Sequence, residues 1–313
     1  MIISASRRTD IPAFYAQWFI NRIKDGYCTV PIPFNSKQIS TISLKPEDVE
    51  VIAFWTRHAQ PLIPYLDELD RRGLRYYFQY TILGYPKQID PASPDLEKAI
   101  TTFKSLVEKI GKEKVIWRYD PIVFSSITDA IYHQEKYKYI AEALKGYTLR
   151  SVISLADEYY KTRKRMLALE KMDVKIMQPQ ITDEWFCTCM QNLSDIAMAN
   201  NMEPQSCAEV LDLSSFGIQA GKCIDDEYIQ RLFKINLNLK KDPNQRAVCG
   251  CVVSKDIGMY DSCLFECPYC YATKSFDLAH ENHKKHDPKS PSLLGWYEPQ
   301  QISMDLSDGK GIK

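Results

Sequence analysis

Short apolar runs and amphipathic segments alternate along most of the chain. The apolar runs are rich in β-branched and aromatic residues, which is typical of buried strands, and they cover residues 2–6, 51–55, 75–82, 114–119, 150–155, 174–178, 204–209 and 248–253. The segments between them have apolar residues at helical spacing and cover residues 12–26, 61–73, 93–111, 132–146, 158–172, 183–201 and 225–237. The pattern therefore predicts a repeated strand–helix unit.

Helix boundary signals support this pattern. Ser93 and Pro94 are suited to begin one helix, and glycines follow four of the helical segments, at Gly26, Gly73, Gly111 and Gly146. Repeated strand–helix units favour an α/β fold with a parallel sheet and helices outside it. Six to eight such units favour a full or partial (β/α) barrel of the TIM type over an open sheet.

Polar residues follow several of the predicted strands. In a (β/α) barrel the reactive groups lie at the carboxyl ends of the strands, so these side chains are expected to line the barrel mouth. Each one alone is explained equally well as a strand-end cap or a surface ion pair. The candidates are Arg7, Arg8, Asp10, Arg57, Gln79, Arg118, Asp120 and Glu209.

Composition and charge narrow the class of protein. The 313 residues are 45% hydrophobic and 26% charged, which is ordinary for a folded protein, and 40 basic side chains balance 40 acidic ones. No overall field attracts the chain to nucleic acid or to an anionic membrane, so neither is expected as a partner. The first residues, MIISASRRTD, are unlike a signal peptide, and no apolar run approaches eighteen residues. We therefore expect a cytoplasmic protein.

Three of the ten cysteines stand in the stretch DSCLFECPYCYAT, at Cys263, Cys267 and Cys270. Disulfides are not expected in a reducing compartment. Thiolates at this spacing can reach three corners of an iron–sulfur cubane and leave one iron open. A zinc site is an alternative, although structural zinc sites normally close four positions, and cysteines that merely fill the core are another.

The C-x3-C-x2-C spacing with an aromatic residue before the third cysteine resembles the signature of radical S-adenosylmethionine (radical SAM) enzymes. The stretch CPYCYA, which contains Tyr269 and Tyr271, is similar to the loop of spore photoproduct lyases within that superfamily. The whole chain resembles domain-of-unknown-function family 1848, whose members carry such a cysteine cluster near the C-terminal end. That whole-chain resemblance implies no particular reaction.

The superfamily resemblance implies a [4Fe–4S] cluster and S-adenosylmethionine as cofactors. The open iron would bind the amino and carboxylate groups of S-adenosylmethionine, and reductive cleavage would give a 5′-deoxyadenosyl radical that acts on an unidentified small molecule or peptide. A reductase or flavodoxin-type protein would supply the electron. Tyr269, and with it Tyr271, is expected near the cofactor, together with Arg7, Arg8, Asp10, Arg57 and Gln79. Arg118, Asp120 and Glu209 are the candidate catalytic residues.

The signature usually follows the first barrel strand, whereas here it comes after the last predicted strands. If residues 248–253 form the strand that normally comes first, the strand at residues 2–6 lies beside it. The barrel is then circularly permuted, which is tolerable because chain ends commonly lie close together. We expect a barrel body at residues 1–246, a cysteine-rich iron–sulfur segment at 247–279 and a tail at 280–313.

Four further cysteines lie within 45 residues of one another, at Cys207, Cys223, Cys249 and Cys251. Four thiolates can close a second [4Fe–4S] cluster or a zinc site. The alternative is that some of them are buried small hydrophobes.

From the sequence we therefore expect the protein to be a radical SAM enzyme. A non-catalytic iron–sulfur or zinc protein, acting as an electron relay or as a structural metal site, is the alternative from another class. A DNA-repair lyase is a third hypothesis, which the balanced net charge disfavours.

Overall fold

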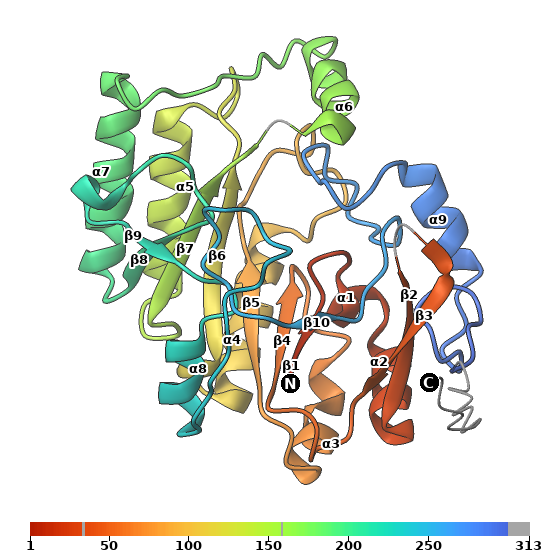
Figure 1. Cartoon of the computed structure of the whole chain (residues 1–313). Helices are drawn as coiled ribbons and strands as arrows, with labels where there is room; N and C mark the ends of the chain where they lie inside the picture. The colour runs from red at the N-terminus through yellow and green to blue at the C-terminus, as the bar shows by residue number, and fades with distance from the viewer. Residues whose placement is uncertain (33–34, 158, 300–313) are drawn as a thin grey trace, which may run out of the picture.

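An all-parallel sheet of eight strands forms the centre of the protein (Figure 1). The structure is a computed structural model that describes residues 1–32, 35–157 and 159–299. The strand order is β10-β1-β4-β5-β6-β7-β8-β9. The strands are β1 (Ile2–Ala5), β4 (Val51–Thr56), β5 (Tyr76–Thr81), β6 (Val115–Ile122), β7 (Arg150–Leu155), β8 (Glu203–Cys207), β9 (Gln219–Gly221) and β10 (Lys255–Asp256).

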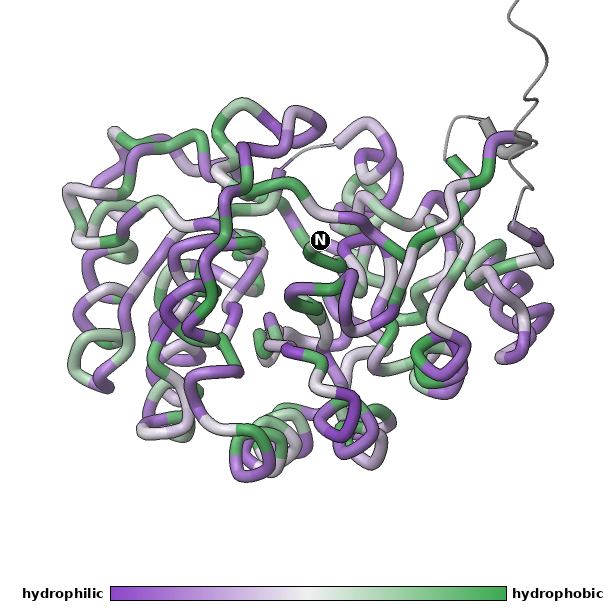
Figure 2. The backbone as a smooth tube through the Cα atoms, turned by 60° about the horizontal axis from the view of Figure 1, so that its bottom comes forward, coloured by the Kyte–Doolittle hydropathy of each residue, from purple (hydrophilic) through white to green (hydrophobic). Residues whose placement is uncertain are grey.

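Helices follow most of the strands and pack on the outside of the sheet. They are α1 (Ile11–Phe14), α2 (Ala16–Asp25), α3 (Leu66–Arg71), α4 (Leu96–Ile110), α5 (Ala130–Ala143), α6 (Tyr160–Glu170), α7 (Glu184–Ala199), α8 (Asp226–Phe233) and α9 (Phe276–Lys284). Hydrophobic and hydrophilic positions alternate along the peripheral helices in Figure 2, as expected for helices with one face on a core. The predicted α/β fold with a parallel sheet is confirmed. In the described part of the chain no pairing joins the edge strands β9 and β10, so closure into a barrel stays a prediction.

The two faces of the sheet pack against different parts of the chain. Ile52 and Phe54 of β4 belong to the large core that the sheet makes with the helices. Val51 and Ala53 of the same strand point the other way, because successive side chains of a strand alternate. They join a second core with the segment that contains α8 and Cys223. This second core borders the predicted cofactor site.

Two predicted strands are wrong. Residues 248–253 form only an isolated bridge between Val252 and Lys241, and residues 174–178 form only a bridge between Ile176 and Ser125. Both runs are apolar because they contribute side chains to the cores and not because they are strands of the sheet. Val252 lies in the second core, and Val174 lies in the first. The strand beside β1 is instead β10, which starts two residues after the predicted run ends.

A β-hairpin was not expected from the sequence. Its strands, β2 (Tyr27–Ile32) and β3 (Asn35–Ser43), pair with each other in a separate antiparallel sheet. Pro31 argues against a strand because proline cannot donate a backbone hydrogen bond. The hairpin tolerates it because β2 pairs on one side only, with a register shift at Pro31.

The C-terminal segment returns to the body of the protein beside this hairpin, next to α9 in Figure 1. Trp18 donates its indole N–H to the carbonyl of Ser290 at 3.0 Å, and Thr29 donates its backbone N–H to the carbonyl of Pro291 at 2.9 Å. Leu293 is buried. The described part of the predicted tail therefore docks on α2 and β2.

His133 of α5 makes fold stability depend on pH. It is fully buried, with Nδ1 accepting from the Tyr119 hydroxyl at 2.9 Å and Nε2 donating to the Val123 carbonyl at 3.1 Å. Burial lowers the pKa of His133 to about 4, whereas an unfolded histidine titrates near its ordinary value of 6.5. Its contribution to stability is therefore complete above pH 6.5 and is lost as the pH falls toward 4.

We expect the free energy of unfolding to fall by about 2–3 kcal/mol between pH 7 and pH 4.5 through this residue. Urea unfolding at the two pH values measures it, with His133→Gln as the matched variant. The variant is expected to be less stable at pH 7 and to lose less stability on acidification. An equal loss in both proteins would contradict the assignment to His133.

Candidate metal and cofactor site

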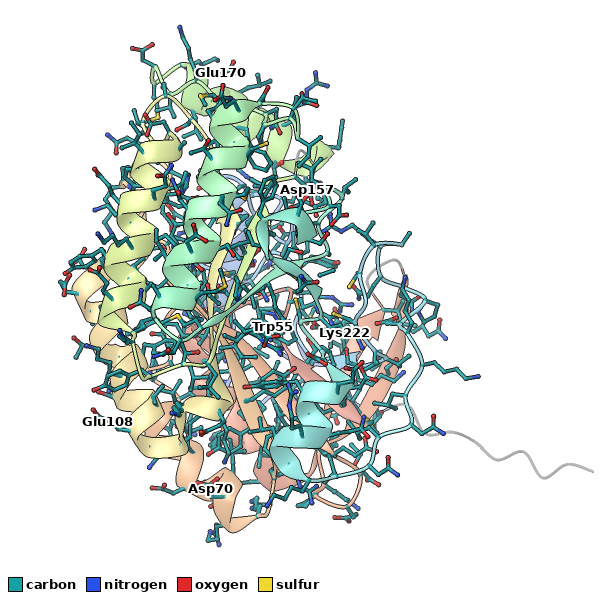
Figure 3. The ribbon with its side chains drawn as sticks, turned by 90° about the vertical axis from the view of Figure 1, so that its left-hand side faces the viewer. Trp55, Asp70, Glu108, Asp157, Glu170 and Lys222 are labelled. Atoms are coloured by element: carbon teal, nitrogen blue, oxygen red, sulfur yellow. The ribbon has the colours of Figure 1, made fainter. Side chains whose placement is uncertain are left out.

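A cavity of about 480 Å³ lies at the carboxyl ends of the central strands. Figure 3 shows the two ends of the sheet: Asp157 and Glu170 lie toward the carboxyl end, whereas Asp70 and Glu108 lie at the opposite end. The cavity wall contains all seven cysteines predicted to bind metal, namely Cys207, Cys223, Cys249, Cys251, Cys263, Cys267 and Cys270. It also contains Arg7, Arg8, Asp10, Arg57, Arg118, Asp120, Tyr269 and Tyr271.

The loop that carries the C-x3-C-x2-C spacing begins directly after β10. Its turn is closed by the backbone N–H of Cys270, which donates to the Cys267 carbonyl at 3.0 Å. Phe265 packs against Phe14 of α1 with ring centroids 4.7 Å apart, and the Tyr15 hydroxyl donates to the Ser262 carbonyl at 2.6 Å. Contacts with α1 and the start of α2 therefore fix the loop at the cavity.

Asp256 joins the start of this loop to the first strand. One carboxylate oxygen accepts from the Ser4 hydroxyl at 2.8 Å and the Arg7 backbone N–H at 2.9 Å, and the other from the Ser6 hydroxyl at 2.6 Å and the Gly258 backbone N–H at 2.9 Å. Because β10 has only two residues and makes few backbone hydrogen bonds to β1, the Asp256 carboxylate supplies much of the connection between the two strands. Asp256 was not predicted from the sequence, because one aspartate in SKDIG forms no pattern.

Gly258 passes so close to Ser6 that no larger residue fits. A Cβ placed on Gly258 would lie 2.0 Å from Ser6 Oγ and 2.6 Å from Ser6 Cβ. We expect Gly258→Ala to destabilise the fold by about 1–3 kcal/mol, as overpacking does, and to displace the start of the cysteine loop. Thermal unfolding measures the loss. The double variant Ser6→Gly/Gly258→Ala is expected to recover part of it, and no recovery would contradict the steric explanation.

Arg57 connects the end of β4 to the cysteine loop. It donates from Nη1 to Asp90 at 2.6 Å, to Ser93 at 2.6 Å and to the sulfur of Cys267 at 3.2 Å, and from Nη2 to the Tyr269 hydroxyl at 3.1 Å. Burial acts to lower the pKa of Arg57, but Asp90, Tyr269 and Cys267 raise it well above its ordinary value. The guanidinium therefore stays charged beside Cys267.

Arg165 of α6 holds the same loop from the other side, although no sequence pattern predicts this role. It donates to the carbonyl oxygens of Pro268 at 3.0 Å, Thr273 at 2.6 Å and Lys274 at 3.2 Å, and also to that of Cys270. The residue lies in the basic run KTRKRM, where nothing distinguishes it from its neighbours.

Burial favours the neutral form of the loop thiols. It raises the pKa of Cys263 to about 12 and that of Cys267 well above its ordinary value, although Arg57 opposes the second shift. Metal binding to these sulfurs must therefore release protons, since thiolates are the ligands.

The other four cysteines meet on the second face of the sheet. Cys207 ends β8 and its sulfur lies 2.6 Å from that of Cys223, which follows β9. Cys223 also contacts Cys251, which contacts Cys249 in turn. The hydrogen bond from Cys251 lowers the pKa of Cys249 to about 7. These four residues are referred to below as the four-cysteine group.

Arg118 lies between this group and the cavity. It is 3% exposed and donates to Asp120 from Nη2 at 2.7 Å, to Gln79 at 3.2 Å and to the sulfur of Cys223 at 3.2 Å. Gln79 therefore lies behind Arg118 instead of in the cavity wall. Glu209 is also set back, because its carboxylate accepts from the backbone N–H groups of Leu155 and Val210, both at 2.9 Å.

The residues after β1 approach the cavity from the opposite side. The guanidinium of Arg7 lies 5.2 Å from the ring of Trp55, and that of Arg8 lies 5.2 Å from the ring of Tyr260. Asp10 begins α1 by accepting from the backbone N–H of Ala13 at 2.9 Å, and it also accepts from that of Arg57 at 2.6 Å. Burial raises the pKa of Asp10 to about 7.

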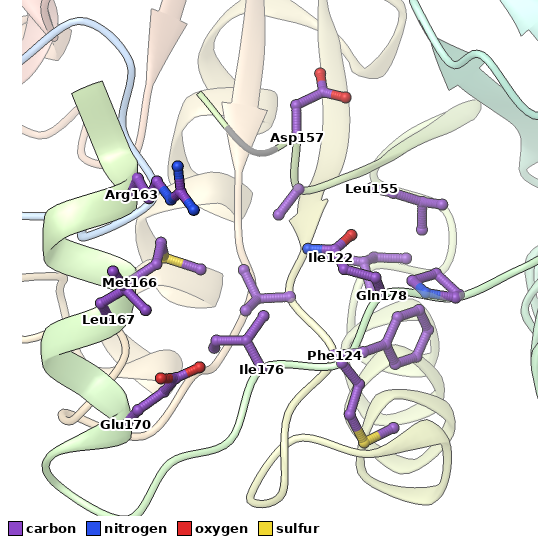
Figure 4. Close-up of a pocket in the computed structure, with 14 residues that line it drawn as sticks. Ile122, Phe124, Leu155, Asp157, Arg163, Met166, Leu167, Glu170, Ile176 and Gln178 are labelled. Carbon is purple, nitrogen blue, oxygen red and sulfur yellow. The ribbon is translucent and has the colours of Figure 1, made fainter. Parts of the chain in front are cut away.

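A smaller cavity of about 180 Å³ adjoins the first and shares Leu155, Ala156 and Asp157 with it (Figure 4). Met166 and Leu167 of α6 face Ile122, Phe124 and Ile176 across it, and its charged residues are Asp157, Arg163 and Glu170. Most of its lining residues are apolar.

Two features are absent from the described residues. No group of three or more histidine, cysteine, aspartate or glutamate side chains there is placed to hold one metal ion. In the same part of the chain, no helix has both the length and the apolar character needed to cross a membrane.

Comparisons with known proteins give one match. No curated protein and no solved structure matches the chain. A family model described as "Domain of unknown function (DUF1848)" matches residues 2–272, which is most of the sequence and includes all the cavity residues named above. The chain therefore belongs to the domain-of-unknown-function family DUF1848.

Proposed function

We propose that this protein is a radical SAM enzyme in which Cys263, Cys267 and Cys270 hold a [4Fe–4S] cluster with one open iron. The observation that carries the proposal is that a loop with this cysteine spacing follows a strand and delivers all three residues to one large cavity. Cavities at the carboxyl ends of parallel strands are where such folds bind ligands. When bound, the reduced cluster would supply the electron that cleaves S-adenosylmethionine to methionine and a 5′-deoxyadenosyl radical.

The surroundings of the three cysteines fit such a cluster. Arg57 places a positive charge 3.2 Å from the sulfur of Cys267, which favours the thiolate that a metal needs. Arg165 and Asp256 fix the two ends of the loop. A ligand loop that is held rigidly by such contacts binds its metal more tightly.

We also propose that the sheet is a partial, circularly permuted barrel. The cysteine loop follows β10, and β10 lies in parallel beside β1. The strand that precedes the cysteine loop thus comes last in the sequence but lies at the edge of the sheet next to β1. This arrangement supports the permutation expected from the sequence, with β10 in place of residues 248–253.

The other cavity residues have proposed roles that follow from their contacts. We assign Arg7 and Arg8 to binding a carboxylate, and Tyr269, within the cysteine loop itself, to a stacking contact with the adenine. Arg118 and Asp120 face the substrate as a buried ion pair 2.7 Å apart. Glu209 binds two backbone N–H groups, and we therefore assign it to holding the strand ends instead of touching substrate.

The smaller cavity offers a place for an apolar part of the substrate. Methionine side chains such as Met166 and Met177 adapt to irregular ligands. Because Leu155 lines both cavities, one molecule could extend from the smaller cavity into the main one.

Electron paramagnetic resonance of the reconstituted, reduced protein tests the open iron directly. We expect a [4Fe–4S]⁺ signal whose shape changes when S-adenosylmethionine is added, because the cofactor binds the iron itself. A cluster signal that S-adenosylmethionine leaves unchanged would favour a fully ligated electron relay and would contradict the proposal.

A further inference from the structure

We propose that the four-cysteine group, Cys207, Cys223, Cys249 and Cys251, binds a second iron–sulfur centre in which the protein supplies all four ligands. The inference goes beyond the proposed function, because it rests on different residues and requires no S-adenosylmethionine chemistry.

Three separate places in the fold bring these four sulfurs together. Cys207 ends β8, Cys223 follows β9, and Cys249 and Cys251 come from the loop before β10. The sulfurs form an unbroken series of contacts, with Cys207 and Cys223 2.6 Å apart. Cysteines that only fill a core do not need to meet one another. Convergence of four thiols is typical of a metal–thiolate site.

Hydrogen-bond donors point at the sulfurs. The backbone N–H of Ile224 donates to the sulfur of Cys251 at 3.3 Å, and Arg118 donates to that of Cys223 at 3.2 Å. A protonated thiol is a weak acceptor, whereas a metal-bound thiolate is a good one. Donors to the cluster sulfurs are also one of the means by which proteins set the reduction potential of iron–sulfur centres.

The charges around the group suit a dianionic centre. Four thiolates around a metal centre with two positive charges leave two negative charges. Arg118 donates to the sulfur of Cys223, and Arg7 lines the same cavity as the four cysteines. Nη2 of Arg7 is buried and has no hydrogen-bond partner among the described residues. Guanidinium groups in this position would balance the charge of the centre.

The present spacing of the sulfurs does not select the kind of centre. A zinc ion needs its four sulfurs around one point, about 3.8 Å from one another for bonds of about 2.3 Å. A cubane binds each cysteine through a different iron and needs the sulfurs farther apart than that. The contact of 2.6 Å between Cys207 and Cys223 is shorter than either centre requires, so binding must separate these sulfurs, and the measured iron and zinc contents distinguish the two centres.

Iron and sulfide analysis of anaerobically reconstituted full-length protein tests the second centre. The triple variant Cys263→Ala/Cys267→Ala/Cys270→Ala should keep about four irons per chain, and Cys207→Ala/Cys223→Ala should also keep about four, against about eight in the wild type. Zinc is measured in the same samples, and circular dichroism verifies folding. Cys187→Ala, on α7 away from the cavity, is the matched control and should keep all the iron.

Loss of all iron from a folded triple variant, or stoichiometric zinc in place of iron, would overturn the second centre. If Cys207→Ala/Cys223→Ala does not fold, the single variant Cys251→Ser provides the same comparison. The two proposals fail differently. A missing second centre leaves about four irons in the wild type and none in the triple variant, whereas a missing first centre leaves the iron content of the triple variant equal to that of the wild type.

Discussion

Replacing Cys267 with alanine is expected to reduce cleavage of S-adenosylmethionine to background, a loss of at least about a hundredfold. Cys267 is the central ligand of the loop and the only one whose sulfur accepts a hydrogen bond from Arg57 among the contacts that the structure describes. With only two of the three loop cysteines left, the protein would no longer hold the cluster firmly. The amount of 5′-deoxyadenosine formed with excess reductant measures the effect.

Cys187→Ala is the matched control for this experiment. The Cys187 thiol donates to the carbonyl of Ile181 at 3.1 Å and does not line the cavity. We expect this variant to form 5′-deoxyadenosine like the wild type. Wild-type turnover by Cys267→Ala, or equal losses in both variants, would contradict the assignment of Cys267 as a cluster ligand.

Replacing Arg57 with alanine is expected to destabilise the fold by about 3–5 kcal/mol, because it leaves a buried carboxylate without its partner. Asp90 is 2% exposed and lies 2.6 Å from Arg57. The same change removes the donors to Cys267 and to the Tyr269 hydroxyl. We therefore also expect weaker retention of iron, by about tenfold to a hundredfold.

Two variants separate these effects. Arg71→Ala removes an arginine that is 72% exposed and pairs with Glu68 at the surface, so it should change stability very little. Arg57→Lys keeps the charge near Asp90 but cannot reach all four acceptors, so it should recover stability more than iron retention. Urea unfolding and iron analysis give the two quantities. A loss for Arg57→Ala as small as that for Arg71→Ala would show that the pair does not hold the site together.

The parallel sheet could be predicted because each strand is short, apolar and separated from the next by a helical segment. The errors in the predicted strands arise where a buried segment is not a strand, or where a strand is not apolar. Residues 248–253 are apolar because Cys249, Cys251 and Val252 pack on the second face of the sheet. In contrast, Lys255–Asp256 is a strand although it is polar, since Asp256 makes hydrogen bonds that the pattern of hydrophobic positions does not encode.

The candidate site was predicted in part for a similar reason. Arg7 and Arg57 follow strands and Arg118 lies within β6, and the carboxyl ends of parallel strands meet at one edge. A side chain that binds backbone carbonyl groups leaves no comparable pattern in the sequence. Arg165 binds the cysteine loop from a helix about a hundred residues earlier, and only the folded chain brings the two together.

Formation of 5′-deoxyadenosine by the reconstituted wild-type protein, with dithionite and S-adenosylmethionine under anaerobic conditions, is the decisive measurement of radical SAM activity. We expect at least about one equivalent per chain, dependent on the reductant, because S-adenosylmethionine would bind at the open iron of the cluster. A protein that contains an intact, reduced cluster and forms no 5′-deoxyadenosine would contradict it.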